Sequence, residues 1–177
     1  GVPLSPYVRK VAVVLELKGI AYESEPSLPG AVPRDISPLG KIPALVDGDV
    51  AIADSTVICE YLEEKFPAVP TLPQGVAARA RARWLEELGD SKLGELCGGG
   101  IFFERVVKKM LMGQDGDEAK VKNTIDNLLP PVLDYLEGQL PAEGFLFGTP
   151  GVADIGIATH FVNAGYAGYS VDAARWP

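Results

Sequence analysis

The sequence has few of the side chains that metal sites and disulfides require. It contains one histidine and two cysteines in 177 residues, so it offers no cluster of metal-ligating His and Cys side chains. Cys59 and Cys97 lie far apart, and each falls in a helical pattern, which favours buried free thiols over a disulfide. His160 is alone in a helical segment, as structural histidines usually are. We therefore expect no metal site.

Positive charge and long apolar runs are also scarce. The chain has 16 Lys and Arg against 24 Asp and Glu, a net charge of −8 and a pI near 4.7. Binding to nucleic acid or to an anionic membrane needs clustered basic residues, so we expect neither partner. No stretch approaches the roughly 20 apolar residues of a membrane span. The segment Gly1–Leu4 shows no signal-peptide pattern, and we expect a cytoplasmic protein.

What the sequence does have is a first half that alternates helix and strand patterns. Apolar spacing predicts a helix over residues 6–17, and residues 21–28 are typical of a weak strand. The Asp47-Gly48 pair is a strong hairpin signal and predicts strands over 44–47 and 50–53. A further helix is predicted over 55–65. A helix at Pro6 calls for a strand before it, and four residues are too few. We expect the first strand of the sheet to be missing here.

The second half is helical throughout. Three prolines and Gly75 mark a linker, after which the pattern stays helical from Val76. The first long helical segment is expected to bend at Gly98-Gly99-Gly100, where helix propensity is weak. Further helical segments are predicted from about 117 to 140 and from Gly151. We predict an α/β domain over 1–66, a linker over 67–75 and an all-helical domain over 76–177 that is truncated at its C-terminus.

The stretch "LSPYVRKV" places a serine at a helix start. Pro6 suits the first helical position, so Ser5 is the predicted N-cap. Ser5 can be a cap alone, or its hydroxyl can also donate its own proton to a thiolate. A hydrogen bond to a charged group is worth about 1.5–3 kcal/mol, enough to lower a thiol pKa by roughly one to two units. Glutaredoxin-like dithiol chemistry is excluded, because Ser5 and Val8 occupy its two cysteine positions.

Two further short stretches, one at a proline and one at a helix start, carry polar groups. At Lys41-Ile42-Pro43, a cis proline would leave the Ile42 backbone free to pair with a peptide, with Lys41 beside it to meet a carboxylate. An ordinary trans proline at a strand start is the alternative. At Asp54-Ser55, the helix start could bind an α-carboxylate while Asp54 pairs with an ammonium group. The alternative is that these residues only cap the helix.

Together, "SPYVRKV", "SPLGKIPAL" and "ADSTVICEYLEEKFP", followed by a proline linker and a helical domain, resemble a soluble glutathione transferase. The first motif is similar to the serine-type, bacterial-like members. The resemblance implies a thioredoxin-like N-terminal domain followed by a helical bundle, with glutathione as co-substrate, no other cofactor, and a homodimer. It also implies the roles of six residues: Ser5 activates the glutathione thiol, Lys41 meets the glycyl carboxylate, Ile42 pairs with the cysteinyl backbone, Pro43 is cis, and Asp54 and Ser55 hold the γ-glutamyl end.

One departure from the family pattern lies in the helical domain. The family's core helix opens with Ser or Thr three residues before an Asp, whereas "PGVADIGIA" has Gly151 before Asp154. Asp154 can still reach back to the Gly151 N–H. We expect some loss of local stability and no loss of activity.

The function we predict is conjugation of glutathione to small hydrophobic electrophiles, as in detoxification. The electrophile site is expected between the domains, beside Ser5, although aromatic residues at helical spacing are often core. Its candidate residues are Leu4, Tyr7, Trp84, Phe102 and Phe103. The alternative function is a non-catalytic binding or regulatory module with the same fold.

Overall fold

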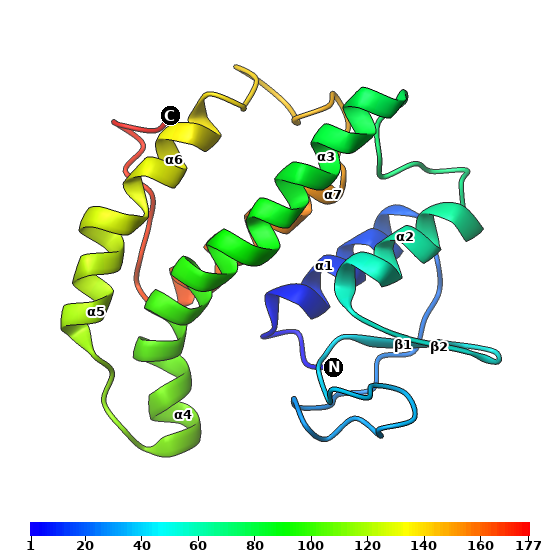
Figure 1. Cartoon of the computed structure of the whole chain (residues 1–177), viewed down its shortest axis with the longest axis horizontal. Helices are drawn as coiled ribbons and strands as arrows, with labels where there is room; N and C mark the ends of the chain where they lie inside the picture. The colour runs from blue at the N-terminus through cyan, green and yellow to red at the C-terminus, as the bar shows by residue number, and fades with distance from the viewer.

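The computed structural model describes all residues from Gly1 to Pro177, and Figure 1 shows the arrangement of its helices and its single hairpin. None of its helices combines the length and apolar character that crossing a membrane requires. The elements in chain order are α1 (Pro6–Leu17), β1 (Ala44–Asp47), β2 (Val50–Ala53), α2 (Ser55–Lys65), α3 (Val76–Leu88), η1 (Gly89–Val107), α4 (Lys108–Met112), α5 (Glu118–Asn123), η2 (Thr124–Leu128), α6 (Pro130–Glu137) and α7 (Val152–Tyr166).

The hairpin β1–β2 is the only sheet in the chain. The strands are antiparallel, with Ala44 opposite Ala53 and Asp47 opposite Val50, which confirms the predicted strands and turn. The predicted strand over 21–28 is wrong. That segment has no neighbouring strand, and its one bond to a distant residue is from the Gly1 ammonium to the Glu25 carbonyl, 2.8 Å away. A strand forms only where a second backbone satisfies its N–H and C=O groups.

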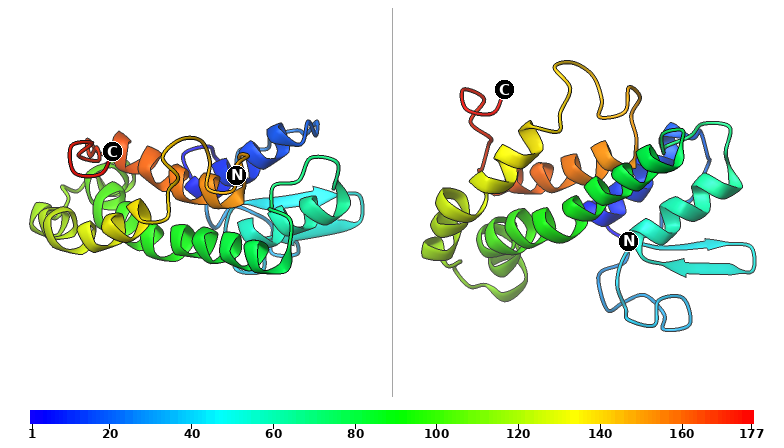
Figure 2. Two further views of the ribbon diagram at one scale, coloured as in Figure 1. Left: turned by 90° about the horizontal axis from the view of Figure 1, so that it is seen from above. Right: turned by 45° about the horizontal axis from the view of Figure 1, so that its top comes forward.

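The helical second half begins with one long run. The elements α3, η1 and α4 follow one another without a break, and η1 is a π-helix of 19 residues that contains the three glycines 98–100. Figure 1 shows the run changing direction between α3 and α4, as expected of a segment with weak helix propensity. Figure 2 shows the hairpin at the opposite end of the molecule from α5 and α6.

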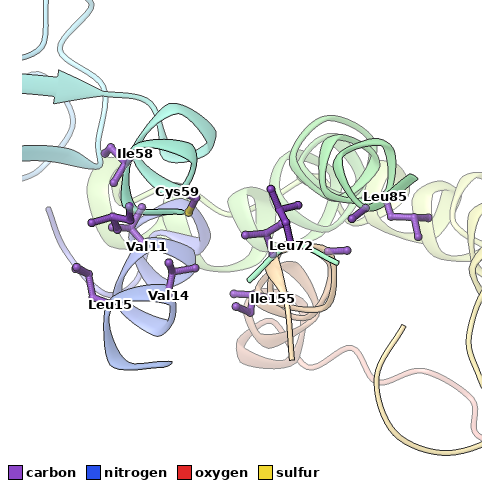
Figure 3. Close-up of a cluster of buried hydrophobic side chains, with 12 residues drawn as sticks. Val11, Val14, Leu15, Ile58, Cys59, Leu72, Leu85 and Ile155 are labelled. Carbon is purple, nitrogen blue, oxygen red and sulfur yellow. The ribbon is translucent and has the colours of Figure 1, made fainter. Parts of the chain in front are cut away.

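Helix α7 joins the two halves of the chain. It packs against α1, α3 and η1, so a segment near the C-terminus lies beside the first helix. Figure 3 shows the shared core, in which Val14 from α1 and Ile155 from α7 point toward one another and toward residues of α2, the linker and α3. Because both halves bury side chains in this one cluster, the start of α1 is held in a fixed position against the helices.

The packing at the start of α7 explains why Gly151 stands where the family pattern has Ser or Thr. Asp154 Oδ2 accepts from the Gly151 N–H at 3.0 Å, which confirms the predicted back-bond. A Cβ on Gly151 would lie 2.7 Å from the carbonyl oxygen of Thr71, which itself accepts from the Val152 N–H at 3.0 Å. The linker passes so close that Ser or Thr does not fit without a shift.

Candidate functional site

A cavity of about 900 Å³ lies where the two halves meet. The first half supplies the start of α1, the loop before β1 and the start of α2, and the second half supplies residues of η1, α4 and α7. All six residues predicted to bind glutathione line this cavity, as do four of the five predicted for the electrophile. These ten are Leu4, Ser5, Tyr7, Lys41, Ile42, Pro43, Asp54, Ser55, Phe102 and Phe103.

Ser5 is the N-cap of α1. Its backbone is extended (φ −72°, ψ 127°), and its Oγ accepts from the Val8 N–H at a long 3.4 Å. The hydroxyl donates to no group within the protein, so its proton is free for another acceptor. Half-buried at the cavity wall, Ser5 therefore caps the helix and retains the donor that thiolate stabilisation requires.

The loop before β1 presents unpaired backbone to the cavity. The Ile42–Pro43 bond is cis. Neither the N–H nor the C=O of Ile42 pairs with another backbone group, whereas the neighbouring Lys41 carbonyl accepts from Ser37 Oγ at 2.9 Å. The Lys41 side chain is exposed and forms no salt bridge. The loop over residues 41–43 therefore offers one backbone donor, one backbone acceptor and one cation side by side.

The start of α2 is held by Asp54. Its Oδ1 accepts from the N–H groups of Thr56 at 2.9 Å and Val57 at 3.2 Å, while Oδ2 has no partner within the protein. Asp54 is the one non-glycine residue with a positive φ, +94°. Such a conformation costs about 1–3 kcal/mol and is found mostly at functional sites. Ser55, which follows it, is buried and lines the cavity.

Part of the cavity wall from the second half is apolar. Phe102 and Phe103 on η1 line it together with Val107, Met110 and Leu111 from the end of the long helical run. Trp84 does not, and this part of the prediction is wrong.

Trp84 lies on the outer face of α3. It is 54% exposed, and its Nε1 donates to the Tyr135 hydroxyl of α6 at 2.9 Å. The neighbouring Leu85 faces the core, and successive helical residues differ in direction by about 100°. Because Leu85 of α3 faces the core, the Trp84 side chain points away from the cavity.

Behind the cavity wall, a buried lysine links four elements. Lys10 of α1 is fully buried, and its Nζ donates to Glu86 Oε1 at 2.8 Å, to Thr56 Oγ1 at 3.1 Å and to Asp90. Burial lowers the Lys10 pKa, but the charges of Glu86 and Asp90 outweigh it and raise the pKa above its ordinary value. No local sequence pattern indicates this group, because its members are up to 80 residues apart.

His160 of α7 also lies at this wall. It is fully buried, its Nε2 is 3.8 Å from Asp90 Oδ1, and its ring meets that of Tyr7 edge-on with centroids 5.4 Å apart. The Tyr7 hydroxyl donates to the Asp90 carbonyl at 2.9 Å. Burial raises the Tyr7 pKa, and the negative charge of Asp90 adds to this. The sequence analysis expected a purely structural His160 and did not predict that it borders the cavity.

Both cysteines are free and buried, as expected. Burial raises the pKa of each thiol, Cys59 and Cys97, to about 12. Neither lines the cavity. The protein therefore supplies no thiolate of its own there, and a sulfur nucleophile has to come from a bound molecule.

Comparison with known proteins identifies the family. The family profile "Glutathione S-transferase, N-terminal domain" matches residues 1–71. Glutathione S-transferase 3 of Zea mays is 34% identical over 156 residues, covering 84% of this chain and 68% of the relative. A stringent starvation protein A homolog of Pasteurella multocida is 42% identical over 82 residues, 45% of this chain. The matched part spans only 39% of that relative's length.

The same family is found among solved structures. A glutathione S-transferase from Rhodospirillum rubrum F11 superposes with a TM-score of 0.88 at 30% identity, covering 100% of this chain and 81% of that one. The likeness confirms the predicted fold class, a small thioredoxin-like part followed by helices. The chain belongs to the glutathione S-transferase family.

Proposed function

We propose that the protein is a serine-type, bacterial-like glutathione transferase in which Ser5 stabilises the glutathione thiolate for attack on small electrophiles. The observation that carries this proposal is the convergence of Ser5, the 41–43 loop and the Asp54-Ser55 corner on one cavity. These three segments come from different parts of the first half and meet only in the folded chain.

Each polar group matches one part of glutathione. The free N–H and C=O of Ile42 suit the cysteinyl backbone, and Lys41 suits the glycyl carboxylate. The unpaired Oδ2 of Asp54 suits the γ-glutamyl ammonium, and the N–H of Ser55 at the helix start suits its carboxylate. In this proposed pose the cysteinyl sulfur lies between the 41–43 loop and Ser5.

Ser5 is the best-placed group to stabilise a thiolate. Its hydroxyl has no acceptor within the protein, and it lies at the N-terminus of α1, where the helix dipole also favours negative charge. Together these lower the thiol pKa from about 8.5 towards neutral. The competing hydroxyl, that of Tyr7, is already committed to the Asp90 carbonyl.

The apolar side of the cavity suits hydrophobic electrophiles, with Leu4, Phe102 and Phe103 as lining residues. The likeness to family members further supports three proposals: a division into 1–66, 67–75 and 76–177, a homodimer, and detoxification in the cytoplasm.

A non-catalytic binding or regulatory module is the second candidate. It is favoured by the 42% identity to a protein named for starvation and not for a transferase activity. The two candidates differ in what they need from Ser5, because only the enzyme needs its free hydroxyl proton.

The proposal is tested by comparing the wild type with Ser5→Ala and with Ser91→Ala as a matched control. Ser91 lines the same cavity, but its hydroxyl donates to the Glu87 carbonyl at 2.7 Å. We expect Ser5→Ala to lower the turnover of an aryl chloride at neutral pH by at least about tenfold, equivalent to about 1.4 kcal/mol. Glutathione affinity, measured by calorimetry, should change less.

Ser91→Ala should retain the wild-type turnover. Equal turnover in Ser5→Ala would contradict the serine mechanism. A wild type that binds glutathione but conjugates nothing would favour the binding module.

A further inference from the structure

The glycines of the helical segment η1 differ in what surrounds them. Three of them are closely packed, because an added Cβ would lie less than 3.0 Å from a neighbouring group. These are Gly89, Gly94 and Gly100. A Cβ on either of the other two, Gly98 and Gly99, would meet nothing within 4 Å. Packing therefore requires glycine at three of the positions, but not at 98 or 99.

The backbone conformation does not require glycine at these two positions either. Gly98 and Gly99 lie inside η1 and are not among the glycines with a positive φ. Glycine inside a helix is less favourable than alanine, because it loses more conformational freedom on folding. Gly98 and Gly99 therefore lower the stability of the helix without serving close packing or a special backbone conformation, which points to a role in ligand binding.

Both glycines face the cavity. They line it and are half-buried, and the space beside their Cα atoms is open. Gly94 and Phe102, each four residues from Gly98, line the same cavity, as neighbours on one face of a helix do. Between Gly94 and Phe102, this part of the cavity wall is therefore bare backbone.

This bare wall begins next to the turn that carries Ser5. The Tyr7 hydroxyl, two residues after Ser5, donates to the Asp90 carbonyl at 2.9 Å. A Cβ on Gly94 would lie 2.6 Å from the same hydroxyl. The bare wall thus runs from the start of α1 towards Phe102, and a molecule joined to a sulfur at Ser5 can extend along it.

The cavity has the size and the lining for a wide aromatic molecule. Its volume of about 900 Å³ lies near the top of the range of about 300–1,000 Å³ that is typical of ligand pockets. Phe102 and Phe103 line the cavity just beyond the bare wall, and aromatic rings pack favourably in offset or edge-on arrangements. A surface without side chains, next to two aromatic rings, suits a flat ligand.

We propose that Gly98 and Gly99 are specificity-determining residues, whose missing side chains let the protein accept electrophiles with two or more fused aromatic rings. This inference rests on the proposed function and names its substrate class. In a helix the Cα–Cβ bond tilts towards the N-terminus, so a side chain at position 98 would extend over Gly94 and narrow the cavity there. A single ring needs less of this width.

The kinetic test compares two electrophiles that react in the same way and differ in width, benzyl bromide and 2-(bromomethyl)naphthalene. In both, the glutathione thiolate attacks the methylene carbon, the C–S bond forms, the C–Br bond breaks, and bromide leaves with the bonding pair. A change in the ratio of the two rate constants therefore reports the fit of the ring system.

The variants are Gly98→Ala, Gly98→Leu and, as matched control, Gly165→Leu. Gly165 also has nothing within 4 Å of an added Cβ, but it lies on α7 and does not line the cavity. We expect Gly98→Leu to lower the ratio of kcat/KM for the naphthyl compound to that for the benzyl compound by about tenfold or more. Gly98→Ala should lower this ratio less, and Gly165→Leu should leave it unchanged.

Thermal melts separate this role from a structural one. Alanine and leucine favour a helix more than glycine does, and the space at Gly98 is open, so both Gly98 variants should melt no lower than the wild type. A Gly98→Leu variant that unfolds or melts lower would show that the space is not free and would overturn the proposal. An unchanged ratio in a stable Gly98→Leu would overturn it as well.

A binding measurement does not depend on turnover. In calorimetry, Gly98→Leu should weaken the binding of S-(2-naphthylmethyl)glutathione by about tenfold more than that of S-benzylglutathione, and equal changes would contradict the proposal. A wild type that conjugates benzyl bromide but not the naphthyl compound would overturn this inference and leave the proposed function intact. A wild type that conjugates neither would overturn both.

Discussion

At the scale of single residues, Asp54 combines two tasks that are usually separate. One carboxylate oxygen holds the start of α2 through Thr56 and Val57, and the other is left for the cavity. The backbone at Asp54 has a positive φ of +94°, which Asn and Asp tolerate better than other non-glycine residues. A single substitution can therefore remove the charge while keeping the cap and the backbone conformation.

Asp54→Asn should weaken glutathione binding by about 1.5–3 kcal/mol, the range for hydrogen bonds to charged groups. Its melting temperature should stay close to that of the wild type, because the amide oxygen still accepts from Thr56 and Val57. Ser55→Ala should cost less affinity, since the backbone N–H at the helix start survives.

Titration calorimetry, read beside thermal melts, tests both substitutions. If Asp54→Asn binds glutathione like the wild type, the residue is only a helix cap.

Several of these site residues could be found from the sequence because their signals are local. Ser5 before Pro6, Asp47 before Gly48 and Asp54 before Ser55 each announce a turn or a helix start within two residues. Lys10 and His160 could not be found in this way. A lysine in an amphipathic helix normally faces solvent, and only the fold brings Glu86 and Asp90 to it.

At the scale of elements, the close approach of the linker to α7 sets what its first residue can be. Ser is ordinarily as good an N-cap as any residue, so Gly151→Ser would be expected to stabilise an isolated helix. Here the added Cβ would meet the Thr71 carbonyl at 2.7 Å. We expect Gly151→Ser to destabilise the protein by about 1–3 kcal/mol, the usual cost of overpacking.

Gly165→Ala on the same helix is the matched control, because nothing lies within 4 Å of its added Cβ. Alanine is favoured over glycine inside a helix by roughly 0.5–1 kcal/mol, so this variant should melt at a higher temperature. Urea unfolding of both variants measures the difference. A Gly151→Ser variant more stable than the wild type would show that the linker moves aside at no cost.

The docking of α5 on η1 depends on one carboxylate. Glu104 accepts from Lys120 at 2.8 Å, from the Asp117 N–H at 3.1 Å and from Lys108. These bonds, with those from Lys108 and Lys120 the strongest, lower its pKa to about 2. An unfolded glutamate titrates near about 4.3, so this contribution to stability is complete above that pH and is lost as the pH falls through about 2.

Glu104→Gln should therefore melt at a lower temperature than the wild type at pH 7, and the two melting temperatures should converge as the pH falls towards 2. Glu95→Gln is the control, because that side chain is 64% exposed and pairs only with Lys92. Thermal melts across the acid range measure the difference. A gap that stays constant with pH would show that shape, and not charge, holds α5 to η1.

The whole molecule is held together across its two halves by both polar and apolar contacts. Lys10 makes several of the polar ones, since it joins α1 to α2, α3 and η1. Removing one partner of a buried ion pair leaves the others uncompensated and typically costs about 3–5 kcal/mol. We expect Lys10→Met to lose stability in this range when measured by urea unfolding.

Lys92→Met is the matched control for this change. Lys92 pairs with Glu95 on the surface, with side chains 46% and 64% exposed, and such pairs contribute about 0–1 kcal/mol. A Lys10→Met variant as stable as Lys92→Met would mean that Glu86 and Asp90 find other partners or take up protons.

The sequence alone could not predict which face of a helix in the second half is buried. Trp84, Phe102 and Phe103 all fall in one long helical segment, and the pattern alone placed them together. The two phenylalanines do line the cavity, whereas Trp84 faces α6. Which face of α3 is buried depends on how α7 lies against it, and no local pattern encodes that packing.

The position of α7 has a consequence for how the protein opens. The helix contributes Val152 and Ile155 to the core shared with α1 and Ala164 to the core of the second half, and Ile157 touches both. Both clusters lose contacts if α7 leaves its place. Backbone amides of α1 and of η1 should therefore exchange with solvent through the same cooperative event, and the turn that carries Ser5 shares the kinetic protection of the most distant helices.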